Sequence, residues 1–205
     1  LLADKKLEDR LRRFSYPEQS RHMANELTEE IVDLVANMCR DNSGMVARYY
    51  KAKKELLGLP ELTHVDRYAP LFEAEELVSW DKARQIVLDS FGQFHPDLKA
   101  AAQEFFDKGW IDAEVRKGKT GGAFCSYITP DTHPVILMSY QGRMGDVMTL
   151  AHELGHGAHS FLSQGQTYFN YHGTLPLAEL ASIFAEMLVF DKVTANASDK
   201  DKLAL

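Results

Sequence analysis

The stretch Ala151-His152-Glu153-Leu154-Gly155-His156-Gly157-Ala158-His159 contains the pattern H-E-x-x-H inside a segment that reads as a helix. Because residues 152 and 156 are four apart, an α-helix places their side chains on one face, one turn from each other. Two imidazoles held in this way can bind one zinc ion, each at about 2.0–2.1 Å. Glu153 is rotated by about 100° from His152, so its carboxylate lies beside the metal and can take a proton from a zinc-bound water. The stretch predicts a helix that carries half of a zinc site.

A catalytic zinc ion normally has three protein ligands and one open position, so a third ligand is needed. His159 lies about 10.5 Å from His152 along a continuous helix, which is too far for both to bind one ion alongside His156. We expect His159 to support the ligands or to be an ordinary packed histidine. The metzincin arrangement is excluded, because it requires glycine and histidine where this chain has His159 and Leu162. The third ligand must therefore come from another element.

A second helix is expected from about residue 177 to 193, after Pro176. It is mostly apolar but carries Glu179 and Glu186, which are seven residues apart and share one face. An acid inside an apolar helix needs a partner, and a zinc ion or a zinc-bound histidine would supply one. The alternative is that both glutamates face solvent. Small residues on both helices would allow close approach: Gly155 and Gly157 on the first, and Ala178, Ala181 and Ser182 on the second.

The rest of the chain predicts a mainly α-helical protein with a small β-sheet, of the α+β class. Two helices are expected over residues 18–57, separated by the turn formers of residues 41–44 and ended by Gly58. Their apolar stripe is expected in the core and includes Met23, Leu27, Ile31, Leu34, Met38, Val46, Tyr49, Tyr50, Leu56 and Leu57.

Two further helices are expected before the β region. Ser79 is a plausible N-cap for the first, and Pro96 suits the first turn of the second, which Gly109 ends. Segments 123–129 and 134–140 are short, β-branched and aromatic, so they predict a two-stranded β unit. Asp146 is then expected to cap the H-E-x-x-H helix.

Gly118-Lys119-Thr120 looks like the end of a phosphate-binding P-loop. That motif requires a glycine five residues before Gly118, where this chain has Ala113, and it should follow a strand and open a helix. Strand-like residues follow it here instead. The sequence therefore excludes a P-loop and leaves Lys119 without an assigned role.

The composition is typical of a soluble globular protein and not of a nucleic-acid-binding or membrane protein. The chain has 205 residues, 45% hydrophobic and 26% charged, with a formal net charge of −7. No basic stripe, no apolar run of membrane-spanning length and no signal-peptide pattern stand out, although the chain opens Leu1-Leu2-Ala3 without a methionine. Cys39 and Cys125 do not form a disulfide framework, so reduced thiols and a cytoplasmic location are expected.

Three motifs together resemble one family: H-E-L-G-H-G-x-H at 152–159, A-E-L-A-S-I-F-A-E at 178–186 and G-K-T-G-G-A-F-C at 118–125. The chain is similar to the oligoendopeptidase F group of the thimet oligopeptidase family of zinc metallopeptidases. The resemblance implies a zincin-type catalytic core of a larger helical peptidase. It implies a helical scaffold part over residues 1–117 and a catalytic core over 118–205, within one continuous domain.

By this resemblance one zinc ion is bound by His152, His156 and Glu179, Glu153 is the general base, and Glu186 supports the ligands. It also implies that a substrate cleft runs along Gly121, Gly122, Ala123 and Phe124 and along the strand at 133–140. An exposed edge strand there would pair with an extended peptide through main-chain hydrogen bonds. Cys125 beside this cleft is expected to be a small packed residue, and a thiol-sensitive activity is the alternative.

The implied activity is hydrolysis of internal bonds in short peptides, with the N- and C-terminal parts of the same enzyme as partners. The alternatives are a carboxypeptidase or dipeptidyl carboxypeptidase of the same zinc class, or a zinc-binding domain without turnover. In the family the tyrosine and histidine that steady the oxyanion come from sequence downstream of Glu186. Tyr168, Tyr171 and His172 are therefore not assigned that role.

Overall fold

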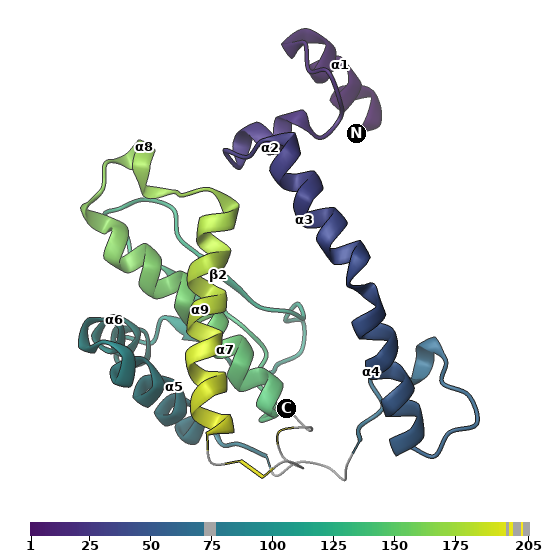
Figure 1. Ribbon diagram of the computed structural model, residues 1–205. Helices are drawn as coiled ribbons and strands as arrows, with labels where there is room; N and C mark the ends of the chain where they lie inside the picture. Colours follow the sequence, from purple (N-terminus) through teal and green to yellow (C-terminus); the bar gives the residue numbers. More distant parts are fainter. Residues whose placement is uncertain (72–76, 196, 199–201, 203–205) are drawn as a thin grey trace. The chain divides into compact units, whose positions relative to one another are not determined.

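The computed structural model describes residues 1–71, 77–195, 197–198 and 202 (Figure 1). Its contacts divide the chain into two compact units, Leu1–Leu71 and Phe72–Leu205. This division differs from the expected boundary at residues 117 and 118. Helices that precede residue 118 pack on the H-E-x-x-H helix within the second unit. The boundary between the compact units therefore lies earlier in the chain than the expected boundary between scaffold and catalytic core.

The first unit is a succession of helices: α1 (Leu2–Arg12), α2 (Gln19–Ala24), α3 (Glu29–Asp41), α4 (Ser43–Leu56) and the 3-10 helix η1 (His64–Asp66). The first of the two helices expected over 18–57 is broken, because Thr28 caps a new helix by accepting a hydrogen bond from the Ile31 N–H at 3.3 Å. Asn42 alone separates α3 from α4. Gly58, at φ 64°, ends α4 as predicted.

The expected core role of the apolar stripe in this unit is wrong for the described chain. Met23, Leu34 and Met38 are 62%, 59% and 57% exposed. The physical reason is that α3 and α4 lie end to end (Figure 1), so neither helix packs along the side of the other. A periodic apolar stripe needs a second element to bury it, and the described residues of this unit do not provide one.

The second unit contains the other predicted helices. These are α5 (Trp80–Phe94), α6 (Pro96–Asp107), α7 (Met144–Leu162), the 3-10 helix η2 (Ser163–Gly165), α8 (Tyr168–Tyr171) and α9 (Leu175–Thr194). Ser79 caps α5 through the Lys82 N–H at 3.3 Å, and Pro96 occupies the first turn of α6, both as predicted. Gly109, at φ 68°, follows the end of α6. The mainly helical α+β class is therefore confirmed.

The sheet has one strand more than the sequence predicted. Within the described residues β1 (Ile111–Asp112), β2 (Phe124–Ser126) and β3 (Val135–Leu137) form a sheet in the order β1-β3-β2. β3 is parallel to β1 and antiparallel to β2. The segment at 133–140 is therefore the centre of the sheet, and its expected role as an edge strand is wrong. Among the described strands, β1 and β2 are the two edges of this sheet.

The start of α7 also differs from the prediction. Arg143 is the N-cap, and Asp146 is the third residue of the first turn. Its Oδ2 accepts hydrogen bonds from the backbone N–H groups of Arg143 at 3.0 Å and Gln141 at 2.8 Å. An acid at this position reaches back to the otherwise unpaired N–H groups at the helix start, so Asp146 stabilises the helix without being its cap.

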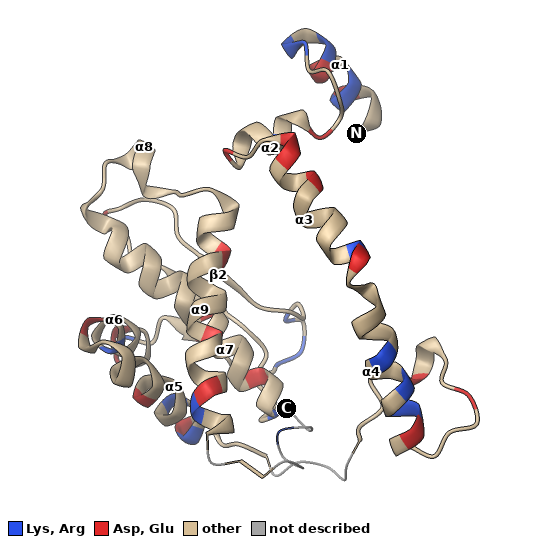
Figure 2. Cartoon of the chain, in the orientation of Figure 1, with Lys and Arg blue, Asp and Glu red and all other residues tan. Residues whose placement is uncertain are grey.

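The core of the second unit surrounds α7, which contacts α5, α6, α9, β2 and β3. Fully buried side chains come from the helices α5, α6, α7 and α9, from β3 and from the residue after it: Phe91, Phe105, Leu150, Leu154, Val189, Ile136 and Met138. Basic and acidic residues both occur in each of the two units (Figure 2). No helix among the described residues is both long enough and apolar enough to cross a membrane.

Candidate metal centre

Small residues bring α7 and α9 into close contact, as the sequence predicted for Gly155. A Cβ added to Gly155 would lie 2.7 Å from the Cβ of Ala185 and 2.7 Å from the Cα of Ser182, both on α9. Gly157 has a different partner from the one predicted. A Cβ there would lie 2.5 Å from the ring of Phe105 on α6. Gly155 thus sets the distance between the two helices, and Gly157 sets that between α7 and α6.

This close contact brings three candidate ligands together at the surface between α7 and α9. Glu179 Oε2 lies 3.4 Å from His152 Nε2 and 3.7 Å from His156 Nε2. The three ligand atoms all lie within 4.8 Å of one another. In a tetrahedral site with metal–ligand distances of about 2.0–2.2 Å, two ligand atoms are separated by about 3.3–3.6 Å. The two nitrogens and the carboxylate therefore fit a zinc ion in type and spacing.

The cluster is open on one side. The side chains of His152, His156 and Glu179 are 28%, 13% and 42% exposed. A structural zinc site is closed by four protein ligands, whereas a catalytic site keeps one position for water or substrate. Three candidate ligands with a solvent-facing carboxylate match the open kind.

Two residues of α9 orient these ligands. Glu186 Oε2 lies 3.3 Å from His152 Nδ1, and protonation of Nδ1 leaves Nε2 free to bind a metal. The Ser182 hydroxyl donates a hydrogen bond to Glu179 Oε2 at 3.0 Å and is itself fully buried. The family resemblance predicted a supporting position for Glu186. Ser182 was predicted only as a small residue that lets the two helices approach. Its place one turn after Glu179 was the signal that it could reach that carboxylate.

Glu153, the predicted general base, lies in a buried environment. Its side chain is buried, at 7% exposed, although it lies on the same turn as His152. Burial raises its pKa above the usual value of a glutamate, and Glu179 raises it further, while His152 and the backbone of Cys125 act in the opposite direction. The pKa of His156 is lowered, chiefly by burial. An unprotonated imidazole is the form that binds metal.

The other predicted site residues are His159 on α7 and the four residues at the start of β2 and just before it. His159 is exposed, so the alternative of a packed histidine is wrong. Gly121 and Gly122 are exposed before β2, Ala123 is half-buried, and Phe124 on β2 is 51% exposed. Of the predicted substrate-binding residues, Phe124 lies on β2, an edge strand that contacts α7, and the other three precede that strand.

Cys125 on β2 lies beside Glu153. Burial raises the pKa of the Cys125 thiol to about 12, and the negative charge of Glu153 contributes. A thiol with this pKa stays protonated near neutral pH and is a weak nucleophile. Cys125 is half-buried, which agrees with the prediction of a small packed residue.

The aromatic residues after α7 form a packing cluster. The hydroxyl groups of Tyr171 and Ser160 are hydrogen-bonded at 2.5 Å. His172 Nε2 is hydrogen-bonded to the carbonyl of Ile128 at 2.9 Å, and its ring stacks on Tyr127 with centroids 5.2 Å apart. These partners join α8 to the segment after β2, and they explain Tyr171 and His172 without a catalytic role.

The chain is similar to known proteins over nearly its whole length. The model of peptidase family M3 matches residues 2–204. The chain is 30% identical over 203 residues to Group B oligopeptidase PepB of Streptococcus agalactiae, which covers 96% of this chain and 33% of that protein. It is 30% identical over 202 residues to the chromosomal oligoendopeptidase F of Lactococcus lactis subsp. cremoris, which covers 95% of this chain and 33% of that protein.

A solved structure shows the same fold. A crystal structure from Bacillus anthracis, named as an oligoendopeptidase F, superposes with a TM-score of 0.79 at 18% identity. The superposition covers 98% of this chain and 38% of that one. The chain thus spans about a third of the length of the curated relatives that it matches.

Proposed function

This chain belongs to peptidase family M3, and from that premise we propose that it forms the catalytic segment of a zinc endopeptidase that cleaves short peptides. One zinc ion is held by His152, His156 and Glu179, and Glu153 is the general base. The observation that carries the proposal is the convergence of three ligand atoms within 4.8 Å from two helices. The names of the relatives, an oligopeptidase and an oligoendopeptidase, support the substrate class.

In this proposal the chain's own residues handle the proton. A bound zinc ion supplies Lewis-acid polarisation of the scissile carbonyl and makes water more acidic. Glu153 accepts the proton of the attacking water and returns it to the leaving nitrogen. Burial raises the pKa of Glu153 above that of an ordinary glutamate, which suits a group that must both accept and release a proton. Glu186 holds His152 in the metal-binding tautomer.

The peptide is proposed to pair with β2. β2 (Phe124–Ser126) is an edge strand that contacts α7, and Gly121, Gly122 and Ala123 lead into it. Glycines allow a second backbone to approach closely. Main-chain hydrogen bonds along such an edge bind an extended peptide with little dependence on its sequence.

The test separates metal binding from chemistry in the longest natural chain that contains these residues. Glu179→Ala should lose zinc, because two imidazoles alone leave the site one ligand short. Glu153→Gln should keep zinc and abolish cleavage of an end-blocked, internally quenched oligopeptide, because the amide cannot accept the water proton. Zinc content is measured by elemental analysis, and unchanged turnover in Glu153→Gln would refute the proposal.

Two alternatives give different results in the same assay. An exopeptidase, such as a carboxypeptidase or dipeptidyl carboxypeptidase, would cleave peptides with free ends and leave end-blocked ones intact. A zinc-binding domain without turnover would bind one zinc ion and cleave neither. The open cluster, with Glu179 42% exposed, favours turnover. A reducing, cytoplasmic location is proposed from the free thiols of Cys39 and Cys125, and cell fractionation tests it.

A further inference from the structure

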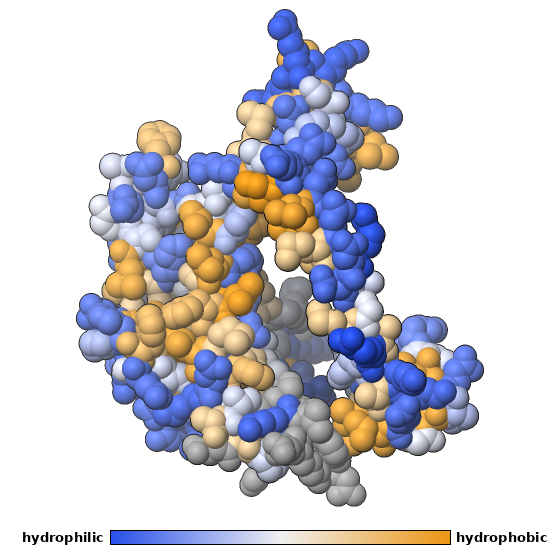
Figure 3. Space-filling model, in the orientation of Figure 1, coloured by the Kyte–Doolittle hydropathy of each residue, from blue (hydrophilic) through white to orange (hydrophobic). Residues whose placement is uncertain are grey.

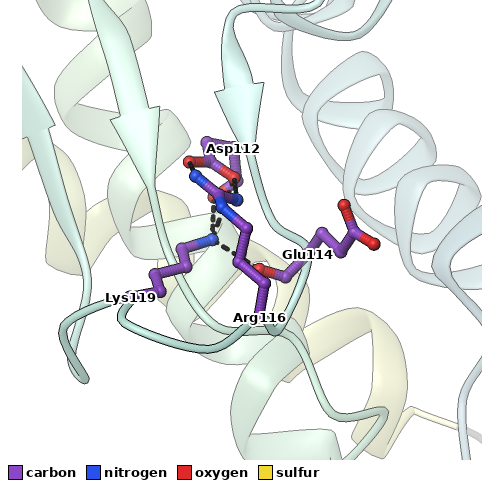
Figure 4. Close-up of polar contacts among 4 residues, drawn as sticks. All are labelled: Asp112, Glu114, Arg116 and Lys119. Carbon is purple, nitrogen blue, oxygen red and sulfur yellow. Dashed lines mark hydrogen bonds and ion pairs between the residues drawn. The ribbon is translucent and has the colours of Figure 1, made fainter.

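An ionic cluster holds the segment between β1 and β2. It includes Lys119, which had no assigned role once a P-loop was excluded. Figure 4 shows Lys119 and Arg116 converging on Asp112, the last residue of β1. The side chain of Glu114 points away from the cluster in the same view. We call Asp112, Arg116 and Lys119 the β1 clamp.

Lys119 is the buried centre of the β1 clamp. Its side chain is 3% exposed. Its ammonium group donates to the carbonyl of Asp112 at 2.9 Å, to Asp112 Oδ1 at 3.0 Å and to the carbonyl of Glu114 at 2.8 Å. An ammonium group has three N–H donors, so each donor has a partner. Loss of the ammonium would remove the hydrogen bond to the Glu114 carbonyl, and it would leave the Asp112 carbonyl with the Met138 N–H as its partner at 2.9 Å.

Arg116 completes the β1 clamp from the solvent side. Its two terminal nitrogens each lie 2.6 Å from one oxygen of Asp112, the two-pronged geometry that a guanidinium forms with a carboxylate. Arg116 and then Lys119 hold the pKa of Asp112 well below its usual range. The carboxylate is therefore ionised throughout the pH range in which peptidases of this kind are assayed, and the clamp is not expected to open within it.

The position of the β1 clamp determines what it can influence. Lys119 comes two residues before Gly121, where the chain enters the proposed peptide-binding edge. Gly118 and Gly122 have positive φ values of 85° and 89°, so the chain turns on both sides of Lys119 and Thr120. β3 holds one side of β2 through the ladder that pairs Phe124 with Leu137. The clamp holds the entry to β2 against β1.

We propose that the β1 clamp positions β2 for peptide binding, and that Lys119 is a positioning residue for the proposed peptidase reaction. This inference rests on the proposed function. Lys119 does not touch the three candidate ligands; it acts through the strand that Gly121 and Gly122 begin. Cys125 of that strand lies beside Glu153, so displacement of β2 would also change the environment of the general base.

The experiment replaces one buried and one exposed lysine of the same loop. In the longest natural chain that contains these residues, Lys119→Met should raise KM for the end-blocked oligopeptide by on the order of 10-fold or more, since small displacements of positioning groups cost up to about 100-fold. The change in kcat should be smaller, and zinc content should stay the same. Lys117→Met, which removes an exposed lysine two residues away, should change neither constant.

Two further variants test the other members of the loop. Asp112→Asn weakens both ion pairs but keeps the backbone carbonyl, so KM should rise by less than in Lys119→Met. Combining the two changes should give less than the product of the separate effects, because both act on one contact. Glu114→Gln should be silent, since only the carbonyl of Glu114 accepts a hydrogen bond from Lys119.

Hydrogen exchange gives a measurement that does not depend on activity. Amides of residues 121–126 should exchange faster in Lys119→Met than in Lys117→Met. Equal exchange in the two variants, or a Lys119→Met enzyme with unchanged KM and only a lower melting temperature, overturns the inference. A parent protein that binds zinc without cleaving peptides refutes the proposed function instead, and the exchange result then still decides whether the clamp holds β2. Asp112→Asn decides it if Lys119→Met does not fold.

Discussion

Both helix pairs, α3 with α4 and α7 with α9, carry apolar faces, but those faces have opposite fates. In the first pair Met38 is 57% exposed, whereas in the second Leu154 is fully buried. The difference lies in which element packs against each apolar face. Gly155 allows α9 to contact the backbone of α7, while α3 and α4 follow one another along the chain. A hydrophobic period therefore identifies a face, and close-packing residues on a partner decide whether that face is buried.

The same contrast holds within α9. The side toward α7 carries Ser182, Ala185 and Val189, all buried. The other side exposes large apolar residues, visible as orange on this face of the second unit (Figure 3): Leu177, Leu180, Ile183, Phe184, Met187 and Phe190. A helix that is apolar on all sides is typical of the interior of a larger protein. This agrees with relatives about three times as long as this chain.

The largest expected effect comes from shortening a buried methionine, and the same change at an exposed methionine is its counterpart. Met138, in the segment after β3, is 1% exposed and lies in the core around α7. Met138→Ala should lower the free energy of unfolding of the second unit by about 2–5 kcal/mol, because it removes buried methylene groups and leaves a cavity. Trp80 and Trp110 both lie in this unit, so denaturant unfolding followed by tryptophan fluorescence measures it. A cost below about 1 kcal/mol would contradict the packed core.

The next prediction breaks the contact that distinguishes the two helix pairs. In Gly155→Ala the new Cβ would lie 2.7 Å from α9 atoms, so α9 must move away from α7. Overpacking of this kind costs about 1–3 kcal/mol, and the movement carries Glu179 away from the two histidines. We expect lower stability together with weaker zinc binding, measured by titration against a chelator.

Gly44 in α4 provides the matched control, because a Cβ there meets nothing within 4 Å. Gly44→Ala should be neutral or stabilise the chain by about 0.5–1 kcal/mol, since alanine restricts the unfolded chain and favours the helix. Equal effects at Gly44 and Gly155 would show that the α7–α9 contact has no special role.

These contrasts also show what could be predicted from sequence. The helix carrying His152 and His156, its partner helix and the approach of Gly155 follow from spacing and residue size, and the structure contains all three. The central position of β3 could not be predicted, because its partner β1 is only two residues long and has no periodic signal. The burial of Gly157 against Phe105 was equally inaccessible, since periodicity does not say which of two neighbouring helices lies opposite a small residue.

A smaller effect is expected where α9 supports a ligand without binding the metal itself. Glu186→Gln keeps the size of the side chain but weakens the hydrogen bond from His152 Nδ1, now 3.3 Å from the carboxylate. Changes of such supporting partners reduce metal affinity by about 10- to 100-fold. Zinc affinity should fall by that amount while the tryptophan-detected unfolding of the metal-free protein changes little. Loss of zinc as complete as in Glu179→Ala would instead make Glu186 a direct ligand.

The smallest expected effect comes from shortening an exposed methionine on α3, with Met138→Ala as the reference. Met38 on α3 is 57% exposed, so Met38→Ala should change the free energy of unfolding of the first unit by no more than about 0.5 kcal/mol. Alanine also favours the helix slightly more than methionine does, which offsets part of any lost contact. Because both tryptophans lie in the second unit, amide exchange of residues 29–56 is the measurement. A loss of 2 kcal/mol or more would mean that another element covers the stripe in solution, and the difference between the two helix pairs would then disappear.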